Sequence, residues 1–573
     1  MTLQTYRDNL TFQPTSDVLP TPLELERPTD IDTTEGRHIM SIDELQSIPM
    51  TAQTNLSHHR DFRSLVTIRN ILLTLIITSS AVLLITQSLT NGNIATEHVY
   101  DDGVYFAASL NVVHGIIPYK DFIFVQPPLI TIWLAPFSLL SNATGTRWAF
   151  EAARLFTDLV SVVDVCLVAF LLRNRSAIRQ IFGVGIIAYS ENILWGSRTI
   201  LIEPYLVALC LAAYIALLNA ETITNSHRRM WIAGILFGLA GATKIWAIFP
   251  MVAALIIIWR IKPHQRSRLV LGTAAGFVVA VAPFALLVPG RFLREVVFTQ
   301  ALRGANGYGI EARLQDLSGI PDLSFLPYIS TTLAIIVLLA IYLLAAILIV
   351  ASLKTWKQRS GTHLELLAAT GTALIGISFL LAHSYFSNYG LFMAPFIALS
   401  LATISYPFRS SATSKSSLRF PVIATGTIAF ILLTFAWQDY KIASRPGLAL
   451  ITRVPTQMST IFGNAGCLWA ANPGIAILAN RYTGDQSACP HSVDWGGTEL
   501  LYVHGYNSVK IKNNPAIQQD FLRWLRKSDR IFVNWSYFGS TEMAYLDSHF
   551  HKVLFQQRYH LPKILYFRNG IPS

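Results

Sequence analysis

Long apolar segments, separated by short basic ones, constrain this chain more than any other feature. Of its 573 residues 52% are hydrophobic and only 13% are charged, which is too few charges to cover a soluble protein of this size. Since about 20 apolar residues cross the hydrocarbon core, we expect a polytopic α-helical membrane protein. About eleven transmembrane helices are predicted, near 66–88, 148–172, 178–195, 203–220, 230–242, 245–260, 269–288, 328–352, 364–382, 389–406 and 420–437.

The basic residues predict how these helices are oriented. The net charge of +11 comes from short clusters between apolar segments, which is typical of cytoplasmic loops and not of a nucleic-acid-binding face. The clusters are Arg173, Arg175 and Arg179; Arg228 and Arg229; Arg260, Lys262, Arg266 and Arg268; Lys354, Lys357 and Arg359; and Arg409, Lys415 and Arg419. If all five are cytoplasmic, the N-terminus is cytoplasmic, and residues 438–573 lie outside. All five clusters fall on the cytoplasmic side only if the short segment 127–140 does not cross the membrane. This segment begins with two prolines, and we expect it to lie at the interface.

Composition divides the chain into three parts. Residues 1–64 are rich in Thr, Pro and acidic residues and lack periodicity, so we predict a disordered cytoplasmic tail. Residues 65–437 form the transmembrane domain, with a long outer loop at 89–147. Residues 438–573 mix short apolar segments with Gly, Pro and Asn, which predicts an extracytoplasmic domain of mixed α/β structure.

The four cysteines have no metal-ligand spacing. Cys166 and Cys210 lie inside apolar segments, so we expect two thiols in the core. Cys467 and Cys489 lie in the polar C-terminal part, where they can form a disulfide if that part is extracytoplasmic. No metal site or other cofactor is predicted, and a requirement for a divalent metal stays open.

Two adjacent carboxylates begin the outer loop, in the stretch EHVYDDGVYFAASL. Neighbouring acids such as Asp101 and Asp102 repel each other, so one should have a raised pKa and suit proton abstraction from a hydroxyl. The alternative for either residue is a loop acid that is simply solvated.

The order of several short motifs resembles the membrane glycosyltransferases of the C-type (GT-C) fold. The pair Asp101–Asp102 is followed by GIIPYKD (115–121) and then by Pro-Pro-Leu, as in the protein O-mannosyltransferases and the lipid A aminoarabinose transferase family. SRTILIEPYLVAL (197–209), GATKIW (241–246) and HSYFSNYGLFMAPFIAL (383–399) are similar to later segments of those enzymes. The resemblance covers roughly residues 66–437.

The resemblance implies a polyprenyl-phosphate sugar as the donor and Asp101 as the catalytic base. Asp102 takes the second acidic position, where many relatives have Glu. Glu203 stands where the mannosyltransferases have Asp, and Ile245 separates Lys244 from the Trp that follows a Lys directly in the related turn.

Two cations in the short outer turns are the predicted ligands of the donor phosphate, namely Arg198 and Lys244. Fixed cations at the outer interface suit a lipid phosphate, and Arg can bind it with two hydrogen bonds. The alternative is that each side chain only reaches toward lipid head groups. Arg147 and Arg154 are weaker candidates, because Arg154 lies four residues before Asp158 and an internal ion pair is expected there.

Further residues are predicted to shape the sugar pocket, each with a structural alternative. They are Tyr119, Asp121, Glu203, His383 and Tyr385, with His114 as an additional candidate. Pro118 and Tyr119 can equally form a turn, and His383 with Tyr385 can equally anchor a helix at the interface. The loop 289–327 is expected to cover the site, but its charges are too balanced to assign.

The sequence therefore predicts an inverting glycosyltransferase that acts on the extracytoplasmic face, on a glycan, glycolipid or protein acceptor. The alternative is a transporter or lipid flippase for an envelope precursor, which Asp158 and Asp164 within a predicted span keep open. A helix-anchored surface-binding protein is the third hypothesis, and it does not explain why so many spans are present.

Overall fold

A computed structural model describes residues 50–319, 362–403, 466–483, 489–504, 507–533, 537–555 and 563–571, with a few single positions between them. The chain from Val66 onward forms one unit. The expected spans at 328–352, apart from single positions, and at 420–437 lie outside the described residues, as do residues 1–49 of the expected tail.

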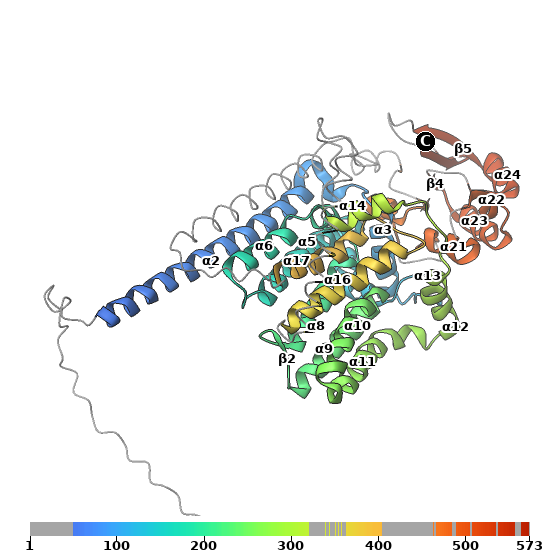
Figure 1. Cartoon of the computed structure of the whole chain (residues 1–573). Helices are drawn as coiled ribbons and strands as arrows, with labels where there is room; N and C mark the ends of the chain where they lie inside the picture. The colour runs from blue at the N-terminus through green and yellow to red at the C-terminus, as the bar shows by residue number, and fades with distance from the viewer. Residues whose placement is uncertain are drawn as a thin grey trace, which may run out of the picture. The chain divides into compact units, whose positions relative to one another are not determined.

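The first half of the chain is helical, as its hydropathy predicts (Figure 1). Its main helices are α2 (Met50–Leu89), α3 (Tyr100–Val113), α4 (Leu129–Thr144), α5 (Thr146–Leu171), α6 (Ala177–Ala188), α7 (Glu191–Gly196), α8 (Glu203–Leu217), α9 (His227–Thr243), α10 (Ile248–Ile261) and α11 (Arg266–Ala285). Short elements between them are η1 (Thr90–Ala95), β1 (Leu218–Asn219), β2 (Thr222–Ile223), η2 (Ile245–Ala247) and η3 (Pro263–Gln265).

Further helices follow up to residue 403. They are α12 (Pro289–Phe292), the π-helical η4 (Leu293–Phe298), α13 (Thr299–Ala301), α14 (Ile310–Ser318), α16 (His363–Leu381) and α17 (Tyr389–Thr403). Within the described residues, three helical segments are long and apolar enough to cross a membrane: Ile68–Leu89, Pro263–Ala285 and His363–Leu381. Five shorter apolar helices accompany them.

Three expectations need correction. Helix α2 begins at Met50, so residues 50–64 are helical and not part of a disordered tail. The predicted span 178–195 is interrupted between α6 and α7, where Tyr189 and Ser190 leave the helical conformation. Cys166 is exposed on α5, whereas Cys210 is buried as expected, because the face of α5 that carries Cys166 does not pack inward.

Glycines bring α9 and α11 into close contact. A Cβ atom at Gly238 would lie 2.2 Å from the carbonyl oxygen of Thr273, and one at Gly276 would lie 2.3 Å from that of Ile235. Small residues four apart allow helix backbones to approach in this way. The packing fixes the end of α9, directly before Lys244.

The segment 127–140 forms the helix α4, which packs between α3 and α5. The Ser109 hydroxyl of α3 donates to the carbonyl oxygen of Thr131 at 2.8 Å, and its oxygen accepts the Ser138 hydroxyl, also at 2.8 Å. These buried hydrogen bonds fix α3 against α4. That α4 lies at the interface without crossing stays a prediction.

The C-terminal part contains a four-stranded sheet of order β3-β4-β6-β5, of which Figure 1 labels β4 and β5. Strand β3 is parallel to β4, and the other two pairs are antiparallel. Its strands are β3 (Leu468–Ala470), β4 (Arg530–Val533), β5 (Phe550–Phe555) and β6 (Lys563–Arg568), and its helices are α20 (Pro473–Leu478), α21 (Trp495–Val503), α22 (Ser508–Lys512), α23 (Pro515–Lys527) and α24 (Ser540–His549). Trp469, Phe521 and Trp524 form the centre of a core between them.

The C-terminal part packs directly on α3. A Cβ atom at Gly103 of α3 would lie 2.4 Å from the backbone nitrogen of Gly474 in α20, so the two backbones touch there. The Tyr482 hydroxyl donates to Oδ1 of Asn111 at 3.1 Å, on the same helix. Cys467 and Cys489 are joined by a disulfide, which ties the start of β3 to the segment that leads into α21.

Candidate active site

A cavity of about 800 Å³ lies where α3, the turn after α9, the segment after α13, the segment after α16 and the start of α21 meet. Its charged and titratable lining includes Asp101, Lys244, Arg303, His383, Asp494 and Glu499. The sequence predicted a site formed by the outer loop 89–147 with Lys244 and His383 and covered by the loop 289–327, and the structure adds the start of α21 to it.

Helix α3 directs its two acidic residues to different sides. Consecutive helical residues point about 100° apart, so Asp101 and Asp102 cannot share one environment. Asp101 is half-buried and lines the cavity, where the Tyr105 hydroxyl donates to its Oδ2 atom at 3.4 Å. Asp102 is 1% exposed and does not belong to the cavity lining. Both lie in the first turn, where negative charge is favourable.

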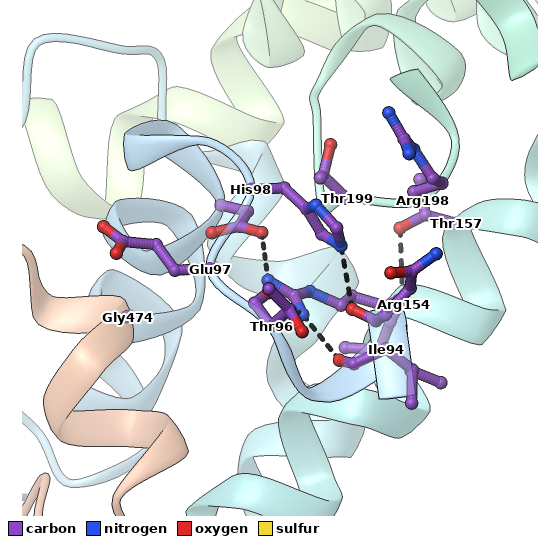
Figure 2. Close-up of polar contacts among 12 residues, drawn as sticks. Ile94, Thr96, Glu97, His98, Arg154, Thr157, Arg198, Thr199 and Gly474 are labelled. Carbon is purple, nitrogen blue, oxygen red and sulfur yellow. Dashed lines mark hydrogen bonds and ion pairs between the residues drawn. The ribbon is translucent and has the colours of Figure 1, made fainter. Parts of the chain in front are cut away.

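Asp102 forms an ion pair with Arg154 of α5. The Nη2 atom of Arg154 donates to Oδ2 of Asp102 at 2.6 Å. Nη1 donates to the carbonyl oxygens of Ile94 and Thr96, at 2.5 and 2.8 Å, as Figure 2 shows. Burial raises the pKa of Asp102, Arg154 opposes the rise, and repulsion by Asp101 contributes least. Burial is thus the main cause of the raised pKa, and not the adjacency that the sequence suggested.

The expected ion pair between Arg154 and Asp158 is absent from the described residues. Asp158 instead accepts a hydrogen bond from the Ser88 hydroxyl of α2 at 2.7 Å. Arg154 turns toward the loop before α3 because three acceptors are available there.

Lys244 lies on the cavity wall and forms an ion pair with Glu203, which does not line the cavity. Its Nζ atom donates to Oε1 of Glu203 at 2.6 Å, and the Asn388 side chain donates to the same oxygen at 2.8 Å. The ammonium also lies 3.5 Å from the ring centroid of Trp246. Glu203 is fully buried and does not line the cavity, so the structure places it as the partner of Lys244 and not in the predicted pocket.

Arg198 is not among the residues that line the cavity. Its Nε atom donates to the carbonyl oxygen of Trp195 at 3.2 Å. It lies near His98, as Figure 2 shows, and burial together with the charges of Arg154 and Arg198 lowers the pKa of His98. The structure therefore does not bring this predicted phosphate ligand to the cavity.

Arg303 is a cation of the cavity that sequence reasoning missed. It follows α13, and its guanidinium lies 4.6 Å from the ring centroid of Phe386. Its neighbours Val297, Gln300 and Tyr308 also line the cavity, so the described part of the loop 289–327 forms one wall. The balanced charges of this loop gave no signal for one particular residue.

Tyr119 and Asp121 form a turn outside the cavity lining. Tyr119 has φ +67°, a left-handed conformation, and its hydroxyl donates to the carbonyl oxygen of Gln126 at 2.6 Å. Asp121 accepts the backbone N–H of Ile117 through Oδ2 at 2.8 Å. These contacts support the structural alternative, since an acid that accepts a local backbone N–H stabilises a turn.

Of the remaining predicted pocket residues, one lines the cavity and the others do not. His383 lines the cavity, whereas Tyr385 is fully buried outside its lining. The Asn306 side chain donates to the carbonyl oxygen of Tyr385, which connects the segment before α17 to the segment before α14. His114 lies at the end of α3, with Nδ1 2.7 Å from the carbonyl oxygen of Leu110, outside the cavity lining.

Part of the cavity is aromatic. Trp246, Phe249 and Phe379 line it from η2, α10 and α16, and the rings of Trp246 and Phe379 pack edge to face with centroids 4.7 Å apart. This wall offers an apolar surface beside Lys244. Among the described residues, no three His, Cys, Asp or Glu side chains come together to hold a metal ion.

The chain is similar to known glycosyltransferases in sequence and in structure. Residues 124–382 match the model of Glycosyltransferase family 87. A comparison with curated proteins finds no significant match. Two solved structures of ArnT from Cupriavidus metallidurans each cover 86% of this chain and 97% of their own. The one bound to undecaprenyl phosphate has 12% identity and a TM-score of 0.53, and the apo structure has 11% and 0.54.

At this identity the likeness to ArnT shows the fold. The resemblance that the sequence predicted is confirmed: the chain is an integral membrane protein with the GT-C fold of membrane glycosyltransferases, and its residues 124–382 resemble glycosyltransferase family 87.

Proposed function

We propose that this protein is an inverting glycosyltransferase that moves a sugar from a polyprenyl-phosphate donor to an acceptor hydroxyl at the extracytoplasmic face of the membrane. The observation that carries the proposal is the position of Asp101, half-buried in a cavity that also contains two cations and an aromatic wall. The match to glycosyltransferase family 87 and the fold shared with an ArnT bound to undecaprenyl phosphate support it.

The donor phosphate binds between Lys244 and Arg303. The Lys ammonium has three N–H donors, and Glu203 accepts one of them, so Lys244 is oriented and still has donors for a phosphate. Trp246 and Phe379 beside it provide apolar surface for the first part of the polyprenyl chain. His383 faces the same space.

Asp101 accepts the proton of the acceptor hydroxyl. The acceptor oxygen forms its bond to the anomeric carbon as the bond from that carbon to the phosphate oxygen breaks. The electron pair of the broken bond leaves with the phosphate, whose charge Lys244 and Arg303 stabilise, and the proton remains on Asp101. A single displacement from the opposite face inverts the anomeric configuration.

Asp101 is preferred over Asp102 because the two carboxylates differ in access. Asp102 is neutralised by Arg154 and buried away from the cavity. Asp158 and Asp164, which kept the transporter alternative open, are buried on α5 and do not line the cavity either.

The test is transfer by the purified full-length protein in lipid nanodiscs, using a panel of radiolabelled polyprenyl-phosphate sugars. Asp101→Asn keeps the size of the side chain and removes its basicity, so transfer should fall by about 10²- to 10⁴-fold. Binding of polyprenyl phosphate should be unchanged.

Glu311→Gln serves as the matched control, because Glu311 is an exposed acid on α14 outside the cavity lining. It should retain wild-type transfer. Wild-type transfer by Asp101→Asn would show that Asp101 is not the base.

A further inference from the structure

The C-terminal part contributes a carboxylate wall to the cavity. Asp494 and Glu499 both line it, and they are 6% and 4% exposed. They lie nearly 400 residues from Asp101 in the sequence, yet the packing of the C-terminal part on α3 brings them to the same space.

This wall adjoins the proposed base. The backbone N–H of Gly496 donates to the Tyr100 hydroxyl at 2.9 Å, and that hydroxyl donates to Oδ1 of Asp494 at 3.5 Å. Burial, with the charges of Asp494, Asp101 and Glu499, raises the pKa of Tyr100 well above its ordinary value. The Tyr100 side chain therefore connects the start of α3 with the carboxylate of Asp494.

Asp101 lines the cavity together with Lys244 and Asp494, and its charge favours the protonated form of both groups. The lining near Lys244 is cationic and aromatic, which suits a lipid phosphate. The lining near Asp494 is acidic, and carboxylates repel a phosphate.

The Glu499 carboxylate on the acidic side is buried and only weakly satisfied by the protein. The indole N–H of Trp495 is its side-chain donor, but within the described part of the chain no hydrogen bond of good geometry reaches the buried Oε1 atom. A poorly satisfied buried acceptor is unfavourable, and a hydroxyl group of a ligand would complete its hydrogen bonding. Burial raises the pKa of Asp494 to about 6 and that of Glu499 to about 7, which hydroxyl donors would oppose.

We propose that Asp494 and Glu499 form the acceptor side of the site and bind hydroxyl groups next to the one that Asp101 deprotonates. The inference rests on the proposed function and extends it to the acceptor. The acceptor is a neutral, polyhydroxylated molecule, because two carboxylates accept hydrogen bonds from hydroxyls and repel a phosphorylated group. Trp495 and Tyr537 line the same wall and offer flat faces to a sugar ring.

A purely structural role for Asp494 is the competing explanation. Its side chain caps α21 by accepting the backbone N–H of Gly497 at 2.7 Å. Asn is an equally good N-cap residue, so Asp494→Asn keeps the cap and removes the charge. The second oxygen of Asp494 also accepts the backbone N–H of Val125 at 3.5 Å, which an amide nitrogen cannot do. A rise in acceptor KM shared with Glu499→Gln, measured beside the unfolding temperature of each variant, therefore separates recognition from folding.

The experiment uses full-length protein in nanodiscs, the polyprenyl-phosphate sugar that the wild type transfers, and neutral octyl glycosides of hexoses and pentoses as acceptor probes. Losing a charge-assisted hydrogen bond should raise the acceptor KM by about 10- to 100-fold in Asp494→Asn and Glu499→Gln. The donor KM should stay unchanged. Asp520→Asn, which removes an acid of α23 outside the cavity lining, should match the wild type.

A second readout tests charge directly. The wild type should prefer a neutral octyl glycoside over its 6-phosphate, and both cavity variants should narrow this preference. Wild-type acceptor KM in both variants, or an equal rise in donor KM, would overturn the inference while leaving the proposed function intact. A wild-type protein that transfers no sugar from any polyprenyl phosphate to any probe would overturn the proposed function itself.

Discussion

Two buried ion pairs have the same length and different surroundings. Arg154–Asp102 and Lys244–Glu203 both measure 2.6 Å, with side-chain exposures of 0% and 2% in the first pair and of 8% and 1% in the second. Arg154 donates its other hydrogen bonds to backbone carbonyls, whereas Lys244 faces the cavity. The first pair is closed and holds the start of α3. The second is open on one side and can bind a ligand.

The largest effect is expected in the closed pair. Arg154→Met strands the buried carboxylate of Asp102 and removes the donors to Ile94 and Thr96, so the protein should lose about 3–5 kcal/mol of stability. Thermal unfolding in detergent measures this loss. The double variant with Asp102→Asn should recover part of it, because no charge remains buried alone. A single variant as stable as the wild type would show that the pair does not hold α3.

The open pair should separate stability from function. Lys244→Met leaves the buried Glu203 carboxylate without a cation and removes a proposed phosphate ligand, so both stability and transfer should fall. Adding Glu203→Gln should restore the unfolding temperature, since the stranded charge is gone. The kcat/KM for the donor should stay about 10- to 100-fold below that of the wild type. Recovery of transfer in the double variant would show that Lys244 acts only through Glu203.

The difference between the pairs also explains what the sequence could predict. Lys244 was predicted because few cations lie in the short outer turns, and this property can be read directly from the sequence. The partner of Arg154 was predicted wrongly, because spacing along α5 favours Asp158 and gives no information about Asp102, which is 52 residues away. Local rules identify residues that share a helix face, but tertiary packing decides which acceptors are nearest.

The same limit applies to the fold and the site as a whole. Hydropathy identified the described apolar helices because lipid requires long apolar segments, but it did not reveal the break at Tyr189–Ser190. The acidic pair drew attention to Asp101 and Asp102, and the resemblance to membrane glycosyltransferases selected Asp101. Asp494 carried only the signal of a helix cap, and its place in the cavity depends on the contact between Gly103 and Gly474, which no local pattern encodes.

The smallest effect is expected at Arg303, the second proposed phosphate ligand, which sharpens the comparison because its guanidinium lies over an aromatic ring at the cavity wall. Arg303 is half-buried after α13 and lies over the Phe386 ring. Arg303→Gln removes a guanidinium that can bind phosphate with two hydrogen bonds, so the donor KM should rise by about 3- to 10-fold. The unfolding temperature should fall less than in Arg154→Met, because Arg303 is half-buried whereas Arg154 is fully buried. Arg294→Gln, in the exposed part of η4 outside the cavity lining, is the matched control and should leave both quantities unchanged. If Arg303→Gln instead destabilised the protein as Arg154→Met does, Arg303 would belong to the scaffold, and Lys244 would remain as the cation assigned to the phosphate.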